Sequence, residues 1–170
     1  MDLLWTPWRY RYMAGTQEVA TKGLPENEAC VFCALLAHGN DAESHIVMRG
    51  ERNFLVLNAF PYTSGHVMIV PYKHIGEFPA LEPETISEMM LMAQRTQVAL
   101  GRIYSPNGFN MGMNLGRAAG AGVAGHVHLH VVPRWVGDTN FMTVTGETRL
   151  APEDLDTTYN KLRRELGLPT

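Results

Sequence analysis

Three histidines alternate with apolar residues in the segment GHVHLHVVPRW (125–135). Successive side chains of a strand point to opposite faces, so we expect His126, His128 and His130 to share one face of a strand. Neutral imidazole can bind a metal ion, transfer a proton or attack an electrophile. Because the chain has only seven histidines, this concentration predicts a site with chemistry rather than a polar surface.

The preceding segment, NLGRAAGAGVAG (114–125), is rich in glycine and alanine. Backbone N–H groups of such a segment can approach an anion closely and surround it, and we expect Gly120 and Gly122 to do so. A nucleophilic imidazole beside a phosphate-binding loop indicates nucleotidyl transfer. Two alternatives remain at this point: the three histidines bind one metal ion together, or they form a polar network without chemistry.

A second candidate site begins at CVFC (30–33), which holds both cysteines of the chain. The pair could be buried thiols or half of a zinc site; a redox pair is disfavoured because no thioredoxin-like strand precedes it. A tetrahedral zinc needs two further ligands, for which His74 and His126 are the best candidates. His38 and His45 are nearer in sequence and remain alternatives. Four protein ligands would leave no position for water, so the metal would be structural.

The clearest element that could support these sites is a helix over 82–104, where Pro83 and Glu84 suit a first turn. Helical spacing predicts a buried stripe of Ile86, Met89, Met90, Ala93 and Gln97. A second helix is expected to start near Pro152 and to end at Gly167. Its predicted apolar stripe is Leu155, Tyr159, Leu162 and Leu166.

The remaining elements are short. We expect a helical segment over 30–39 ended by Gly39, two strands in 45–60 around the turn at Gly50, and strands over 63–74 and 107–116. Consecutive strands with one long helix inserted predict an α+β fold with an antiparallel sheet. We expect one domain over 1–170, in which residues 1–29 form an aromatic N-terminal arm.

Composition limits the possible partners. The chain has 170 residues, 45% hydrophobic and 18% charged, which is typical of a globular domain. A net charge of −3 argues against a nucleic-acid partner. The sequence shows neither an apolar run of membrane-spanning length nor a signal peptide, so we expect a cytoplasmic protein with no membrane partner.

The segment HVHLHVVP fits the His-φ-His-φ-His-φ-φ motif (φ, apolar) of the histidine triad (HIT) family of nucleotide hydrolases and transferases. The block FLVLNAFPYTSGHVMIVPYKH (54–74) resembles the strand–turn–strand unit of that family. LWTPWRYRYM (4–13) and PRWVGDTNFMTV (133–144) resemble the branch that contains diadenosine tetraphosphate phosphorylases. The blocks cover about 110 residues and occur in the family's order.

The resemblance implies a role for each matching position. His128 matches the nucleophile that attacks the α-phosphorus and forms a nucleotidyl-histidine, which requires a neutral ring with an unprotonated Nε2. His130 matches the histidine that holds phosphate oxygens, and His66 matches a supporting histidine. The resemblance further implies that Asn58 lies near the sugar and that Asn114 contacts phosphate. The residues themselves add the loop glycines Gly120 and Gly122, and Trp135, which follows the histidines at the end of the strand and either closes over the base or phosphate or only packs against the protein.

One position departs from the family. Many members carry Gln or Ser in the loop shortly before the triad, where it helps the leaving oxygen, but this chain has Ala121 and Gly122 there. Members with Cys-x-x-Cys use two histidines that match His74 and His126, so the resemblance implies structural Zn²⁺ on Cys30, Cys33, His74 and His126.

The family also implies a homodimer, in which the strand at 107–116 and the helix at 82–104 meet a second copy and WVGDTNF (135–141) reaches the partner's nucleotide. The expected reaction is cleavage of a dinucleoside polyphosphate, with phosphate or water as acceptor. A nucleoside phosphoramidate hydrolase and a nucleotide-binding protein with weak catalysis are the alternatives.

Overall fold

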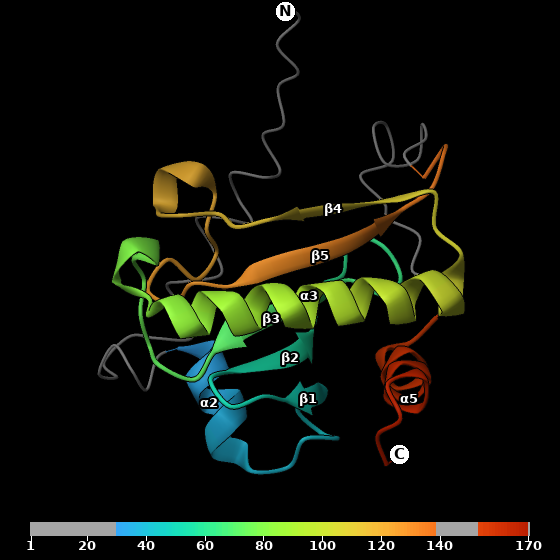
Figure 1. Cartoon of the computed structure of the whole chain (residues 1–170), viewed down its shortest axis with the longest axis horizontal. Helices are drawn as coiled ribbons and strands as arrows, with labels where there is room; N and C mark the ends of the chain where they lie inside the picture. Colours follow the sequence, from blue (N-terminus) through green and yellow to red (C-terminus); the bar gives the residue numbers. More distant parts are fainter. Residues whose placement is uncertain (1–29, 139–152, 170) are drawn as a thin grey trace, which may run out of the picture.

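The computed structural model describes residues 30–138 and 153–169. In this part of the chain one five-stranded antiparallel sheet has the order β1-β2-β3-β5-β4 (Figure 1). The strands are β1 (Ile46–Arg49), β2 (Asn53–Leu57), β3 (Val67–Pro71), β4 (Gly108–Gly112) and β5 (Leu129–Arg134). The helices are α2 (Val31–His38), α3 (Pro83–Tyr104) and α5 (Leu155–Glu165), with short 3-10 turns η1 (Phe78–Ala80) and η2 (Arg117–Ala119). The predicted α+β fold with an antiparallel sheet is confirmed.

The sheet separates two apolar clusters. Leu55 and Leu57 of β2 face a core that α3 and α5 complete, and Figure 1 shows α3 in front of the sheet, running roughly along the strands. Phe54 and Val56 point to the opposite face, where α2 supplies Phe32. Every residue of β2 and β3 is buried because each face of these central strands has a covering helix. The predicted arm at 1–29 and residues 139–141 of the WVGDTNF segment lie outside the described residues.

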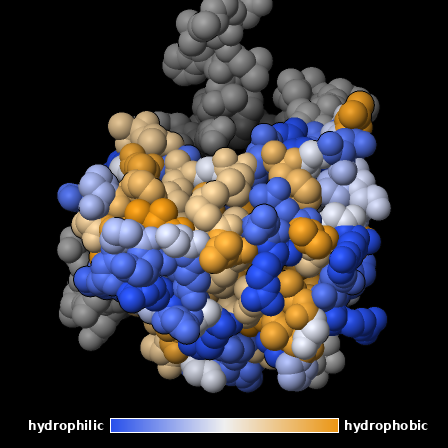
Figure 2. Space-filling model, in the orientation of Figure 1, coloured by the Kyte–Doolittle hydropathy of each residue, from blue (hydrophilic) through white to orange (hydrophobic). Residues whose placement is uncertain are grey.

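Helix α3 spans the predicted residues, but its buried face is rotated from the predicted one. Met89 and Ala93 are buried as expected, whereas Met90 is 44% exposed. The buried residues are Thr85, Met89, Met92, Ala93, Thr96, Ala99 and Leu100. Periodicity missed this face because it includes two threonines; the Thr96 hydroxyl donates to the Met92 carbonyl (2.7 Å) and is thereby satisfied. On the outer side hydrophobic and hydrophilic residues are mixed (Figure 2).

The helix ends follow local sequence signals. Gly39 after α2 and Gly167 after α5 have φ of 76° and 71°, the left-handed conformation that glycine accepts without a Cβ clash. Helix α5 begins at Leu155, where the Asp154 carboxylate accepts from the Thr157 N–H (2.6 Å). The predicted stops at Gly39 and Gly167 are confirmed, and the predicted start near Pro152 falls outside the described residues.

The histidine segment is less regular than predicted. Strand β5 begins at Leu129, so only His130 of the three histidines belongs to it. The Val127 N–H donates to the Ile75 carbonyl (2.7 Å), so an extended segment continues ahead of the strand without a full ladder. Strand β3 ends at Pro71, three residues before His74, and the predicted strands were therefore too long at this end of the sheet. Among the described helices, none combines the length and apolar character needed to cross a membrane.

Candidate active site and metal site

The histidines lie on the face of the sheet opposite α3. In the β3–β5 pairing Met68 is the partner of His130, and Met68 belongs to the apolar cluster on the α2 side. His66 precedes β3 and is two residues from Met68, so it points to the same face. The ring centroids of His130 lie 5.1 Å from His66 and 4.9 Å from His128. The structure thus brings together the three histidines predicted to do chemistry.

His128 is held in one tautomer by the backbone. Its Nδ1 lies 2.8 Å from the carbonyl oxygen of His126, which can only accept a hydrogen bond. In the neutral ring Nδ1 therefore carries the proton, and Nε2 keeps its lone pair. Burial lowers the pKa of His128 from its ordinary 6.5, although the hydrogen bond to the His126 carbonyl opposes this shift. The ring is thus neutral at neutral pH, the state that a nitrogen nucleophile requires.

The tautomer of His130 follows from a chain of hydrogen bonds. The backbone N–H of Tyr62 points at His66 Nδ1 (3.1 Å), so this nitrogen accepts and Nε2 of His66 carries the proton. His66 Nε2 then donates to His130 Nδ1 (2.9 Å), which leaves the proton of His130 on Nε2. The side-chain amide of Asn58 lies 3.3 Å from His66 Nδ1 and can donate to the same acceptor.

His130 is neutral as well, since burial and then the neighbouring His128 lower its pKa to about 4. Two adjacent rings thus present opposite functions on their Nε2 atoms: a lone pair on His128 and an N–H donor on His130. A nucleophile beside a hydrogen-bond donor can attack a phosphorus atom while a non-bridging oxygen is held.

Four further side chains form a group that can hold one metal ion. The ligand atoms of Cys30, Cys33, His74 and His126 all lie within 4.8 Å of one another. His126 Nδ1 is 3.3 Å from the Cys30 sulfur and 3.8 Å from the Cys33 sulfur, and His74 Nδ1 is 3.4 Å from the Cys33 sulfur. Ligands of a tetrahedral zinc with Zn–S bonds of about 2.3 Å and Zn–N bonds of about 2.0 Å lie roughly 3.3–3.8 Å apart. The donor set and its spacing fit that ion.

The surroundings of the group favour metal binding. His126 Nε2 donates to the Pro71 carbonyl (2.8 Å), which orients Nδ1 toward the cysteines. Burial lowers the pKa of His126 to about 4, so the ring is the neutral ligand form. Burial and the neighbouring Cys30 raise the pKa of the Cys33 thiol to about 11. A divalent cation reverses this direction, because it stabilises the thiolate.

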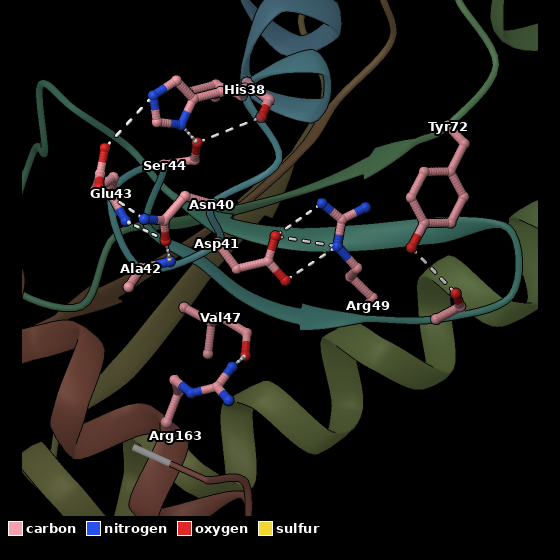
Figure 3. A network of polar contacts seen from close by, with 12 residues as sticks. His38, Asn40, Asp41, Ala42, Glu43, Ser44, Val47, Arg49, Tyr72 and Arg163 are labelled. Carbon is pink, nitrogen blue, oxygen red and sulfur yellow. Dashed lines mark hydrogen bonds and ion pairs between the residues drawn. The ribbon is translucent and has the colours of Figure 1, made fainter.

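The alternative histidine ligands point elsewhere. His38 lies 3.4 Å from the Glu43 carboxylate and 3.5 Å from the Ser44 hydroxyl, and Figure 3 shows its ring in this polar network of the turn after α2. His45 Nε2 lies 2.8 Å from Asp156. The spatial arrangement therefore selects His74 and His126, which are distant from the cysteines in sequence.

The other predicted substrate contacts lie on segments that flank the histidines. Asn114 follows β4, and Trp135 follows β5 and donates its backbone N–H to Asp138 (3.1 Å). Gly120 has a φ of 85°, which explains a glycine there, whereas a side chain at Gly122 would meet open space. Packing against the protein thus does not require a glycine at position 122, and the predicted approach of Gly120 and Gly122 to an anion stays a prediction.

Sequence reasoning missed two aromatic residues of the site. The Phe32 ring contacts the rings of His126 and His128, with centroid distances of 5.4 and 5.0 Å. The Tyr62 ring lies 4.5 Å from that of His66. The position of Phe32 between the two cysteines was the only signal that could have indicated its role.

Comparison with known proteins agrees with this geometry. Residues 40–136 match the HIT domain family. The chain is 38% identical over 167 residues to an AP-4-A phosphorylase of Mycobacterium tuberculosis, covering 97% of this chain and 84% of the relative. That relative is an enzyme, so the prediction of a HIT-family enzyme is confirmed.

Two solved structures have the same fold. A Zn-bound histidine triad family protein of Mycobacterium smegmatis is 31% identical, with a TM-score of 0.67 over 83% of this chain and 95% of the other. A hypothetical histidine triad nucleotide-binding protein of Sulfolobus tokodaii is 23% identical, with a TM-score of 0.67 over 81% and 92% of the two chains, and shows the fold alone. The histidine pattern, the antiparallel sheet and these similarities lead to one conclusion: the chain belongs to the HIT family.

Proposed function

We propose that this protein cleaves dinucleoside polyphosphates such as diadenosine tetraphosphate at the α-phosphate, through a nucleotidyl-histidine on His128. The observation that carries the proposal is the hydrogen bond from His128 Nδ1 to the His126 carbonyl (2.8 Å), because it leaves Nε2 unprotonated. The similarity over nearly the whole chain to an AP-4-A phosphorylase supports this substrate class.

The proposed reaction has two steps. His128 Nε2 forms a bond to the α-phosphorus while the bond from phosphorus to the bridging oxygen breaks, and the electron pair leaves with the nucleoside polyphosphate. The His130 Nε2–H donates to a non-bridging oxygen of the transferring group. An oxygen of phosphate or water then attacks the same phosphorus and releases His128 in its neutral form.

Ala121 and Gly122 favour a polyphosphate over a phosphoramidate as substrate. Neither side chain can donate a proton to a leaving group. A departing phosphate has a second pKa of about 6 and can leave as an anion. A departing amine, with a pKa near that of lysine at about 10, must be protonated as it leaves. We therefore rank nucleoside phosphoramidate hydrolysis second.

We further propose that Asn58, Asn114, Gly120, Gly122 and Trp135 contact the bound nucleotide; the family resemblance implies this for Asn58 and Asn114. Asn58 lies beside His66, which supports a position near the sugar that carries the transferring phosphate. The other four flank the histidines on loops and strand ends, where substrate-binding residues commonly lie.

We propose a structural Zn²⁺ on Cys30, Cys33, His74 and His126, which supplies a cross-link and no reactive position. The ligand spacing and the Zn-bound relative support this assignment. Thiolate ligands persist most readily in a reducing compartment, so we propose a cytoplasmic location.

We also propose a homodimer through β4 and α3. Strand β4 is an edge of the sheet, and exposed edges of this kind are commonly paired or covered. Leu91 and Val98 of α3 are 61% and 53% exposed, and Met111 of β4 is 43% exposed and contacts Gln97 of α3. An apolar surface beside an open strand edge favours a second copy as the occupant.

The test is turnover of diadenosine tetraphosphate with and without inorganic phosphate. Phosphorolysis gives ATP and ADP, whereas hydrolysis gives ATP and AMP. His128→Ala is expected to lower kcat at least about 10³-fold while nucleotide still binds, since both steps need this nitrogen. The control is His38→Ala, which removes an exposed histidine outside the site and is expected to retain activity. Near-normal turnover by His128→Ala would refute the proposal.

A further inference from the structure

Phe32 links the metal group to the proposed nucleophile. It lies between the two cysteines in the first turn of α2, where the Ala34 N–H donates to the Cys30 carbonyl (2.9 Å). Its side chain is 2% exposed. The ring meets His126 edge-on at 5.4 Å and His128 at 5.0 Å with an angle of 49° between the planes. One aromatic side chain thus contacts both a metal-binding histidine and the proposed nucleophile.

His128 is restrained by a hydrogen bond and by neighbouring rings. The covalent Cβ–Cγ bond and the hydrogen bond from Nδ1 to the His126 carbonyl limit the rotation of the imidazole. Packing against neighbouring rings restrains the ring plane further, and with it the direction of the Nε2 lone pair. Phe32 provides such packing with ring centroids 5.0 Å apart, and the rings of His128 and His130 meet at 72° with centroids 4.9 Å apart.

We propose that Phe32 is a positioning residue for His128 and that the metal group fixes it there. Cys30 and Cys33 flank Phe32 in sequence, and His126 supplies both a ligand atom and the carbonyl that holds His128. A metal bound by these residues would therefore restrain both groups that contact the imidazole, the Phe32 ring and the His126 carbonyl. This inference rests on the proposed function only for its kinetic consequence, since the ring contact belongs to the protein without substrate.

Misplacing a reacting atom by about 1 Å can cost roughly 100-fold in rate. Phe32→Leu is therefore expected to lower kcat about 10- to 100-fold while KM changes less than about twofold, because the residue is buried and does not hold the nucleotide. The matched control is Phe54→Leu. Phe54 is buried in the same apolar cluster, but its ring stacks on Tyr72 at 5.6 Å. This control is expected to retain the kcat of the unsubstituted protein.

A second readout needs no substrate. In protein with ¹⁵N-labelled histidine, the His128 signals, assigned by their loss in His128→Gln, are expected to report a single tautomer protonated on Nδ1. Phe32→Leu is expected to broaden these signals or mix the tautomers, whereas Phe54→Leu leaves them sharp. Zinc content is measured in each variant and is expected to stay at about one per chain.

Several results would overturn the proposal. They are an equal kcat in the two variants, a change in KM alone, unchanged His128 signals in Phe32→Leu, or full recovery of Phe32→Leu by added zinc. If Phe32→Leu does not fold, Phe32→Met replaces it. If neither variant folds while Phe54→Leu does, Phe32 contributes to stability alone and the proposal fails. If the unsubstituted protein turned over no dinucleotide, the proposed function would fail, but the histidine signals would still decide the role of Phe32.

Discussion

The protonation pattern of the histidines depends on two backbone groups. The His126 carbonyl places the proton of His128 on Nδ1, and the Tyr62 N–H places that of His66 on Nε2. Because backbone groups cannot change their donor or acceptor character, these assignments hold while the fold holds. Neighbouring imidazoles thereby present a lone pair on one Nε2 and an N–H on the other.

The pH dependence of activity follows from His128. Burial lowers its pKa below the ordinary 6.5, so the folded protein keeps a neutral ring where a free histidine is protonated. Activity is therefore expected to persist as the pH falls through 6.5 and to be lost at lower pH, when the ring gains a proton and Nε2 loses its lone pair. The measurement is kcat/KM against pH, with zinc content followed because protons compete for the ligands. An acid limb centred above pH 6.5 would contradict this expectation.

At the scale of elements, α2 depends on the metal group more than the other helices do. It has only eight residues and no side-chain N-cap, whereas α3 has 22 residues that pack across the sheet. A helix this short is unstable by itself in water. It is attached through the buried ring of Phe32, through Leu35 and Leu36, which pack against the same cluster, and through the cysteines beside His74 and His126.

Metal removal is expected to release α2 before the rest of the fold. Loss of a structural zinc is expected to cost about 3 kcal/mol or more and to lower Tm by roughly 6–12 °C for a chain of this size. Hydrogen exchange should accelerate over 30–38 while α3 stays protected. Added zinc should reverse both effects, and an unchanged Tm after chelation would refute the structural role.

At the scale of the molecule, the sheet is buried at its centre and exposed at the β4 edge. Strands β2 and β3 are fully buried, whereas β4 at the edge carries exposed residues on its second half. Met111 of this strand contacts Gln97 of α3, the residue before the exposed Val98. Pairing two copies here would cover both features at once.

The dimer is expected to dissociate when a charge is placed on this surface. Leu91→Glu and Met111→Glu should each weaken association at least about tenfold, because an apolar interface cannot solvate a carboxylate. Ala80→Glu, at an exposed position of η1, is the control. Light scattering and specific activity are measured over the same dilution series. A loss of activity that follows dissociation would support a site shared between subunits, and a fully active monomer would exclude it.

Much of this architecture could be predicted from local sequence. Alternation and helical spacing identified α3 and the antiparallel sheet, and Gly39 and Gly167 marked helix ends, because these signals depend on residues close together in the chain. The strand at 107–116, expected to meet a second copy, lies at the edge of the sheet as β4. The buried face of α3 was misjudged because threonines can be buried once their hydroxyl is bonded to the helix backbone.

The histidine motif by itself determined the family and the candidate nucleophile, since those depend only on residue type and spacing. The tertiary structure decided which histidines join the cysteines, where β5 begins, which nitrogen of each ring is protonated and that Phe32 packs on His128. These features arise from contacts between residues far apart in the chain, such as Cys30 and His126, 96 positions apart. No local pattern encodes such a contact, because it exists only after the sheet has brought both segments to the same face.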